Sequence, residues 1–185
     1  MNTHIYLVRH AHSNYSSDEL NRPLSERGKR DADKVTEILK KEGIQVLISS
    51  PYKRAVQTIE GLADTLGASI VIENSFRERT LAGQPVDDFE SALSKVWEDD
   101  CFAWEGGESN LDARQRGVEA LTTILKQYPG KNIAVGTHGN LMVLIMNHFD
   151  KRYDFAFWKQ LKMPDIYKLT FNGFRLVEVE QLAVT

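Results

Sequence analysis

The sequence has one cysteine, five prolines and no long hydrophobic run among its 185 residues. The single thiol, Cys101, excludes an internal disulfide and a cysteine-based zinc cluster. The longest aliphatic run, residues 141–146, is far shorter than the ~20 residues that cross a bilayer, so we expect no transmembrane segment. Nothing at the N-terminus resembles the basic and apolar regions of a signal peptide. Together these features predict a cytoplasmic protein.

A large excess of charge of either sign is also missing. The chain has 23 Lys and Arg against 26 Asp and Glu, a net charge of −3. Nucleic acids and anionic membranes select strongly basic surfaces, so neither is an expected partner. A chain of 185 residues, 42% of them hydrophobic, suits one well-buried core. We therefore predict a single domain over residues 1–185, as a monomer or a homodimer.

What the sequence does contain is an alternation of short apolar runs and amphipathic stretches. Residues 5–8 are apolar without period-two alternation, which is typical of a strand buried on both faces. The alternation predicts an α/β fold with three layers, α/β/α, around a mixed, mainly parallel central sheet. The expected strands are residues 5–8, 45–50, 69–73, 132–137, 166–171 and 174–179, and the expected helices are 26–42, 51–66, 86–97, 110–128, 139–148 and 153–161.

Two local features refine this pattern. Ser50 is the expected N-cap of a helix whose first residue is Pro51, a position that proline favours. Residues 74–107 interrupt the regular alternation, and we expect them to form a lid-like excursion. The aromatic residues there are expected to contribute more to the core than to a substrate wall; they are Phe89, Trp97, Phe102 and Trp104.

Three of the expected strands end at reactive side chains. Arg9 and His10 follow the first strand, Arg54 lies shortly after the second, and His138 follows a later one. Ligands of open α/β sheets bind outside the carboxyl ends of the strands. A guanidinium holds a phosphate or carboxylate, and a neutral imidazole acts as a nucleophile or base. If these strands are neighbours, the four side chains form an anion site, to which helix N-termini add N–H groups.

Six motifs of this chain occur in the order found in the histidine phosphatase superfamily, the phosphoglycerate mutase-like group, which the sequence resembles over most of its length. The resemblance implies the phosphatase branch: hydrolysis of a small phosphomonoester without a metal or other cofactor. The chain departs from the usual pattern at Ala11, where glycine is common and where a methyl group could narrow the phosphate pocket. The motifs are residues 7–13, 23–28, 49–58, 77–79, 107–109 and 137–139.

The resemblance also implies roles for individual residues. His10 is expected to become phosphohistidine, while Arg9, Arg54 and a protonated His138 hold the phosphoryl oxygens. Glu78 matches the carboxylate that protonates the leaving group. The further candidates for substrate binding are Ser13, Ser16 and Glu108.

Other interpretations of the same residues stay open at this point. His10 and His12 have the spacing of two metal ligands on one strand face. Glu78, which lies between two arginines, also fits a solvated ion pair, and Glu108 fits either a helix N-terminus or the acid itself. A cofactor-dependent phosphoglycerate mutase uses the same residues, and a phospholigand-binding scaffold with a weakened site is the third alternative, because of Ala11.

Overall fold

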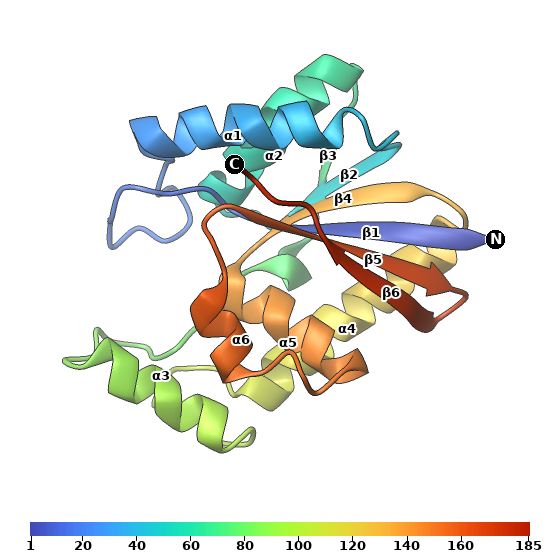
Figure 1. Cartoon of the computed structure of the whole chain (residues 1–185). Coiled ribbons are helices and arrows are strands. Elements are labelled where there is room, and N and C mark those ends of the chain that lie inside the picture. The colour runs from blue at the N-terminus through green and yellow to red at the C-terminus, as the bar shows by residue number, and fades with distance from the viewer.

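The computed structural model describes residues 1–185 and contains one six-stranded sheet with the order β3-β2-β4-β1-β5-β6 (Figure 1). Strands β1 to β4 are parallel, whereas β5 is antiparallel to β1 and β6 is antiparallel to β5. The predicted mixed, mainly parallel α/β architecture is therefore confirmed. The strands are β1 (Asn2–Arg9), β2 (Val46–Ser49), β3 (Ile70–Ile72), β4 (Asn132–Thr137), β5 (Asp165–Asn172) and β6 (Arg175–Gln181).

Helices cover both faces of the sheet. Helices α1 and α2 pack on one face, and α4 and α5 pack on the other, each closing its own apolar cluster (Figure 1). Removal of this apolar surface from water is the main force that holds the layers together. The helices are α1 (Glu26–Leu39), α2 (Lys53–Leu66), α3 (Phe89–Glu98), α4 (Asn110–Gln127), α5 (Gly139–Phe149) and α6 (Phe155–Gln160), with a 3₁₀ turn, η1 (Asn74–Phe76).

Strand β1 is the most completely enclosed part of the sheet. It pairs with β4 on one side and β5 on the other, and residues 5–8 are buried, as the unbroken apolar run predicts. Strand β3 differs from this pattern. It has only β2 as a neighbour, so Val71 and Ile72 stay half exposed although the sequence predicts a buried strand.

The start of helix α2 is a second difference. The sequence predicts a helix from Pro51 capped by Ser50, but α2 begins at Lys53 after Tyr52, with no side-chain cap. The Ser50 hydroxyl instead forms a hydrogen bond of 2.8 Å with Nε2 of His138. The same hydroxyl accepts from the N–H of Tyr52 at 3.2 Å, so Ser50 combines a local bond ahead of the helix with a tertiary contact at the site.

Within residues 74–107, Phe76 of η1 is still buried in the larger apolar cluster, but the chain then leaves the layered core, and α3 lies beyond α5 and α6 (Figure 1). Helix α3 begins three residues later than expected because the Asp88 carboxylate caps it, accepting a hydrogen bond from the N–H of Ser91. Trp97 fixes the excursion to the core, since its indole N–H donates to Oδ1 of Asn140 on α5 at 3.2 Å. None of the helices combines the length and apolar character that a membrane crossing requires.

Candidate active site

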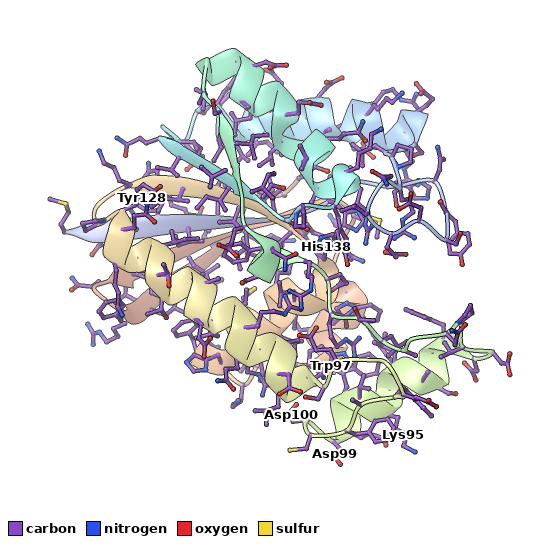
Figure 2. All side chains as sticks on the ribbon, turned by 180° about the vertical axis from the view of Figure 1, so that it is seen from behind. Lys95, Trp97, Asp99, Asp100, Tyr128 and His138 are labelled. Atoms are coloured by element: carbon purple, nitrogen blue, oxygen red, sulfur yellow. The ribbon has the colours of Figure 1, made fainter.

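The carboxyl ends of β1, β2 and β4 place the reactive side chains at one edge of the sheet. Strand β4 lies between the other two and brings residue 137 beside residue 9 and residue 136 beside residue 49. The imidazole rings of His10 and His138 are 5.2 Å apart between centroids, and the guanidinium of Arg54 is adjacent to His10. Figure 2 shows His138 in the interior of the molecule, above Trp97 at the inner side of α3.

The hydrogen bonds of His10 define its tautomer. Its Nδ1 lies 2.7 Å from the carbonyl oxygen of Ala11, which can only accept, so Nδ1 carries the proton. Its Nε2 is then the unprotonated nitrogen, and the Nε–H of Arg54 donates to it at 3.3 Å. Burial, followed by the charge of Arg54, lowers the pKa of His10 to about 3. His10 is therefore a neutral imidazole at pH 7, with the lone pair of Nε2 directed toward Arg54.

This pKa predicts a pH-dependent stability. An imidazole in the unfolded chain titrates near 6.5, whereas His10 in the folded protein titrates near 3, so between these values only the unfolded state takes up the proton. The stabilisation from a neutral His10 is complete above pH 6.5 and is lost as the pH falls. Between pH 7.5 and 5.5 the wild-type free energy of unfolding should fall by about 1.4 kcal/mol more than that of His10→Gln, as measured by urea denaturation. Equal losses in the two proteins would contradict the neutral assignment.

His138 is completely buried and also differs from expectation. Burial lowers the pKa of His138 well below 6.5, and electrostatic repulsion from a protonated His10 and from Arg54 lowers it further. The free protein therefore holds a neutral imidazole here, where the sequence analysis predicts an imidazolium. Its Nε2 shares a hydrogen bond with Ser50, and its buried Nδ1 has no partner. A bound dianion would raise the pKa of this ring, since an opposite charge nearby favours the protonated form.

Arg9 is anchored through the chain that precedes β5. Its Nη1 donates to the carbonyl oxygens of Leu161 and Lys162, both at 3.1 Å, while its Nε is buried without a hydrogen bond. Burial lowers the pKa of Arg9, and Glu78 and then Asp165 counteract this effect. Gly139 permits the arrangement, because a Cβ at this position would approach Nε of Arg9 to 2.9 Å.

Arg54 is buried, and its two terminal nitrogens are already in use. Nη1 donates to the backbone oxygen of Glu19 at 2.8 Å, and Nη2 donates to Oε2 of the Glu19 carboxylate at 2.9 Å. The other carboxylate oxygen of Glu19 lies 3.2 Å from Nη1 of Arg22. The sequence analysis missed both Glu19 and Arg22. The available signal was the position of Arg22, directly before the motif at residues 23–28.

Glu78 occupies the N-terminus of α5. Its carboxylate accepts hydrogen bonds from the backbone N–H groups of Asn140, Leu141 and Arg79, at 3.0, 3.0 and 2.9 Å. A carboxylate at this position is favoured by the helix dipole. Two of the N–H groups that were expected to face the phosphate therefore bind Glu78, and Glu78 forms no ion pair with its neighbouring arginines.

The remaining candidates have other contacts. Both oxygens of the Glu108 carboxylate accept from Arg116, at 2.8 and 2.7 Å, and Arg116 also donates to the backbone oxygens of residues 75 and 77. This ion pair supports the segment that leads to Glu78. Ser13 forms a one-residue β-bridge with Leu24, and the hydroxyl of Ser16 accepts from the N–H of Asp18 at 3.2 Å.

Two residues directly after β1 concern the alternative interpretations, the metal site and the weakened phosphate site. Nδ1 of His12 contacts Oγ of Ser25 at 2.8 Å, and no group of three or more His, Cys, Asp or Glu side chains is arranged to hold a metal ion. Ala11 is completely buried in a small cluster with Leu24 and Ala32. Its methyl group therefore packs in the apolar cluster beneath the loop.

At the carboxyl edge of the parallel strands, the neutral imidazole of His10 lies beside the imidazole of His138 and the guanidinium of Arg54. Such groups form an anion site of the type that phosphoryl transfer uses. Sequence comparison agrees with this class, since residues 5–180 match the histidine phosphatase superfamily, branch 1. The chain belongs to this superfamily, as the motifs predict.

Similar proteins include phosphatases and a probable mutase. The chain is 27% identical over 135 residues to a glucosyl-3-phosphoglycerate phosphatase of Mycolicibacterium vanbaalenii, covering 66% of this chain and 60% of that protein. It is 28% identical over 148 residues to a probable phosphoglycerate mutase, GpmB, of Yersinia pestis, covering 73% and 69%. The structure resembles phosphoserine phosphatase of Entamoeba histolytica, solved with 3-phosphoglyceric acid, with a TM-score of 0.80, 19% identity and coverage of 98% and 97%.

Proposed function

We propose that this protein is a metal-independent phosphatase that hydrolyses a small phosphomonoester through a phosphohistidine intermediate on His10. One observation carries the proposal. The proton of His10 is fixed on Nδ1 by the Ala11 carbonyl, so Nε2 is unprotonated, and its lone pair accepts a hydrogen bond from the Nε–H of Arg54. A nucleophile and a charge-stabilising group are thus held together before substrate arrives.

In the first step, Nε2 of His10 attacks phosphorus and the bond from phosphorus to the ester oxygen breaks. The phosphoryl oxygens carry the developing charge, which Arg9, Arg54 and His138 stabilise. The phosphoryl group also favours protonation of His138, which is neutral in the free protein. Arg9 and His138 are anchored by the backbone oxygen of Leu161 and by Ser50, so these two groups need little reorganisation.

The departing alkoxide needs a proton, and in the second step water must lose one as it attacks the phosphohistidine. We assign both transfers to Glu78. Its charge raises the pKa of Arg9, so the two groups interact, and its carboxylate is fixed at the start of α5. The water oxygen bonds to phosphorus, the bond to Nε2 breaks, and phosphate and neutral His10 are regenerated. Glu108, which is paired with Arg116, is assigned a structural role.

The names of the relatives suggest the substrate class. Glucosyl-3-phosphoglycerate, phosphoserine and 3-phosphoglyceric acid are all small phosphomonoesters that carry a carboxylate. We propose a substrate of this kind. The match to a probable phosphoglycerate mutase makes phosphoryl return to the substrate the second candidate reaction.

A hydrolysis screen tests this proposal. Purified protein is incubated with p-nitrophenyl phosphate, phosphoserine, 3-phosphoglycerate and neutral sugar phosphates, and released phosphate is measured. Release from the carboxylate-bearing esters in preference to the sugar phosphates supports the proposal. Interconversion of phosphoglycerates without release indicates a mutase, and phosphate binding without turnover indicates a phospholigand-binding protein.

Chelation is expected to leave activity unchanged, because Arg9, Arg54 and His138 supply the positive charge at the phosphoryl group. Activity in excess EDTA should stay within about twofold of the untreated protein, since no step of metal-ion catalysis is invoked. Loss of activity that Zn²⁺ or Mg²⁺ restores would revive the interpretation of His10 and His12 as metal ligands.

A further inference from the structure

The carboxylate of Glu19 lies between two arginines, where a bound anionic ligand would be expected to lie. Its carboxylate bridges two guanidiniums, with Oε2 at 2.9 Å from Nη2 of Arg54 and Oε1 at 3.2 Å from Nη1 of Arg22. Arg54 contacts Nε2 of His10 through its Nε, so the carboxylate lies on the guanidinium that adjoins the nucleophile. Glu19 therefore neutralises the cationic edge of the site in the free protein.

This contact competes with the reaction that the site is built for. A phosphoryl group bound at His10 needs a terminal nitrogen of Arg54, and Nη2 now donates to the Glu19 carboxylate, while Nη1 donates to the backbone oxygen of Glu19. A carboxylate and a phosphate dianion cannot share one guanidinium without strong repulsion at this distance. The Glu19 carboxylate must therefore leave Nη2 of Arg54 when a phosphomonoester binds, while the backbone oxygen of Glu19 keeps its bond to Nη1.

Arg22 forms few polar contacts for a largely buried arginine. Its side chain is only 16% exposed, its Nε is buried without any hydrogen bond, and its sole ion pair is the one with Glu19. Its charge contributes to the lowered pKa of both His10 and His138, although less than burial and Arg54 do. Arg22 thus lies within electrostatic reach of both histidines, and no hydrogen bond fixes it elsewhere.

The surrounding loop permits an exchange of partners. The Glu19 side chain is 51% exposed, so its carboxylate can turn into water. A separate turn, in which Asp18 accepts from Asn21, holds the loop locally, and the N–H of Lys53 donates to the carbonyl of Leu20. Release of the Glu19 side chain breaks neither of these contacts.

We propose that the phosphoryl group of the substrate replaces the Glu19 carboxylate between Arg22 and Arg54, so that Arg22 becomes a further phosphate-binding guanidinium of the site. This inference rests on the proposed function, since it concerns the same anion site. Glu19 is then an internal competitor that sets the affinity for phosphate. Arg22 and Glu19 have opposite effects on that affinity.

Titration calorimetry with inorganic phosphate tests the exchange without requiring turnover. Glu19→Gln should bind phosphate about three- to tenfold more tightly than wild type, the range expected for removal of a charge-assisted contact with a half-exposed partner. Arg22→Gln should bind it about tenfold more weakly. Glu60→Gln, which removes one charge from an exposed position of α2, is the matched control and should bind as wild type does.

Two comparisons decide the mechanism. Glu19→Asp keeps the charge but is too short for the bridge, so it should also tighten binding; affinity equal to wild type would overturn displacement. Arg22→Gln would tighten binding if Arg22 only held Glu19 in place, and that result, or no change, would overturn the role of Arg22. If no variant hydrolyses an ester but these affinity changes occur, the proposed function fails and the anion exchange stands. Hydrolysis with unchanged phosphate affinities gives the reverse conclusion.

Discussion

Replacement of His10 with alanine should reduce turnover by on the order of 10³-fold or more, because the proposed mechanism transfers the phosphoryl group to this side chain. The fold should persist, since His10 lies beyond the end of β1 and outside the apolar clusters. Its side chain contacts Ala11 and Arg54 but supports no strand pairing. Circular dichroism of the variant should match wild type.

The intermediate can be observed directly. Brief mixing of wild-type protein with a ³²P-labelled phosphomonoester, followed by denaturation, should leave acid-labile phosphate on the chain, and His10→Ala should carry none. His12→Ala is the matched control, because His12 is a nearby exposed imidazole that contacts only Ser25. Full activity of His10→Ala would rule out the covalent mechanism.

Replacement of Glu78 with glutamine should slow esters with poor leaving groups far more than p-nitrophenyl phosphate. The amide keeps the shape of the side chain and removes the proton donor. General acid assistance is typically worth ~10²–10⁴-fold, and a phenolate leaving group needs little of it. The kcat values for phosphoserine and p-nitrophenyl phosphate should therefore diverge by at least about 10²-fold in this variant.

The structure supplies a specific control for this comparison. Glu78 also accepts two N–H groups of α5, and an amide has only one acceptor oxygen, so Glu78→Gln also disturbs the start of that helix. Such a disturbance would slow both substrates equally. Glu108→Gln breaks the pair with Arg116 and should act equally on both substrates, mainly through stability. A selective effect of Glu108→Gln instead would transfer the acid role to Glu108.

The parts of this molecule that could be predicted depend on local pattern. The apolar run at residues 5–8 identifies a central strand, and the reactive residues that follow three strands identify the edge where they meet. These predictions hold because a buried strand and its end can be identified from the types of a few adjacent residues. The same locality explains why the N-cap rule pointed to Ser50 as a helix cap.

The parts that were missed depend on the path of the chain in space. Ser50 bonds to His138, 88 residues away, and nothing near Ser50 in the sequence indicates this partner. Glu19 and Arg22 lie in a loop without periodicity, so only the tertiary structure brings them to Arg54. The neutral state of His138 in the free protein likewise could not be predicted, because complete burial next to other basic groups is a property of the packed site.

The central position of β4 also affects how the active site is made during synthesis. His10 leaves the ribosome well before the strand with which its own strand pairs in parallel, because that partner strand begins at residue 132. Pairings between such distant segments form late, because a long loop must close first. A growing chain that has not yet reached residue 132 thus carries His10 and Arg54 but lacks both β4 and His138. Phosphate recognition should therefore appear only near the end of folding, as one cooperative event.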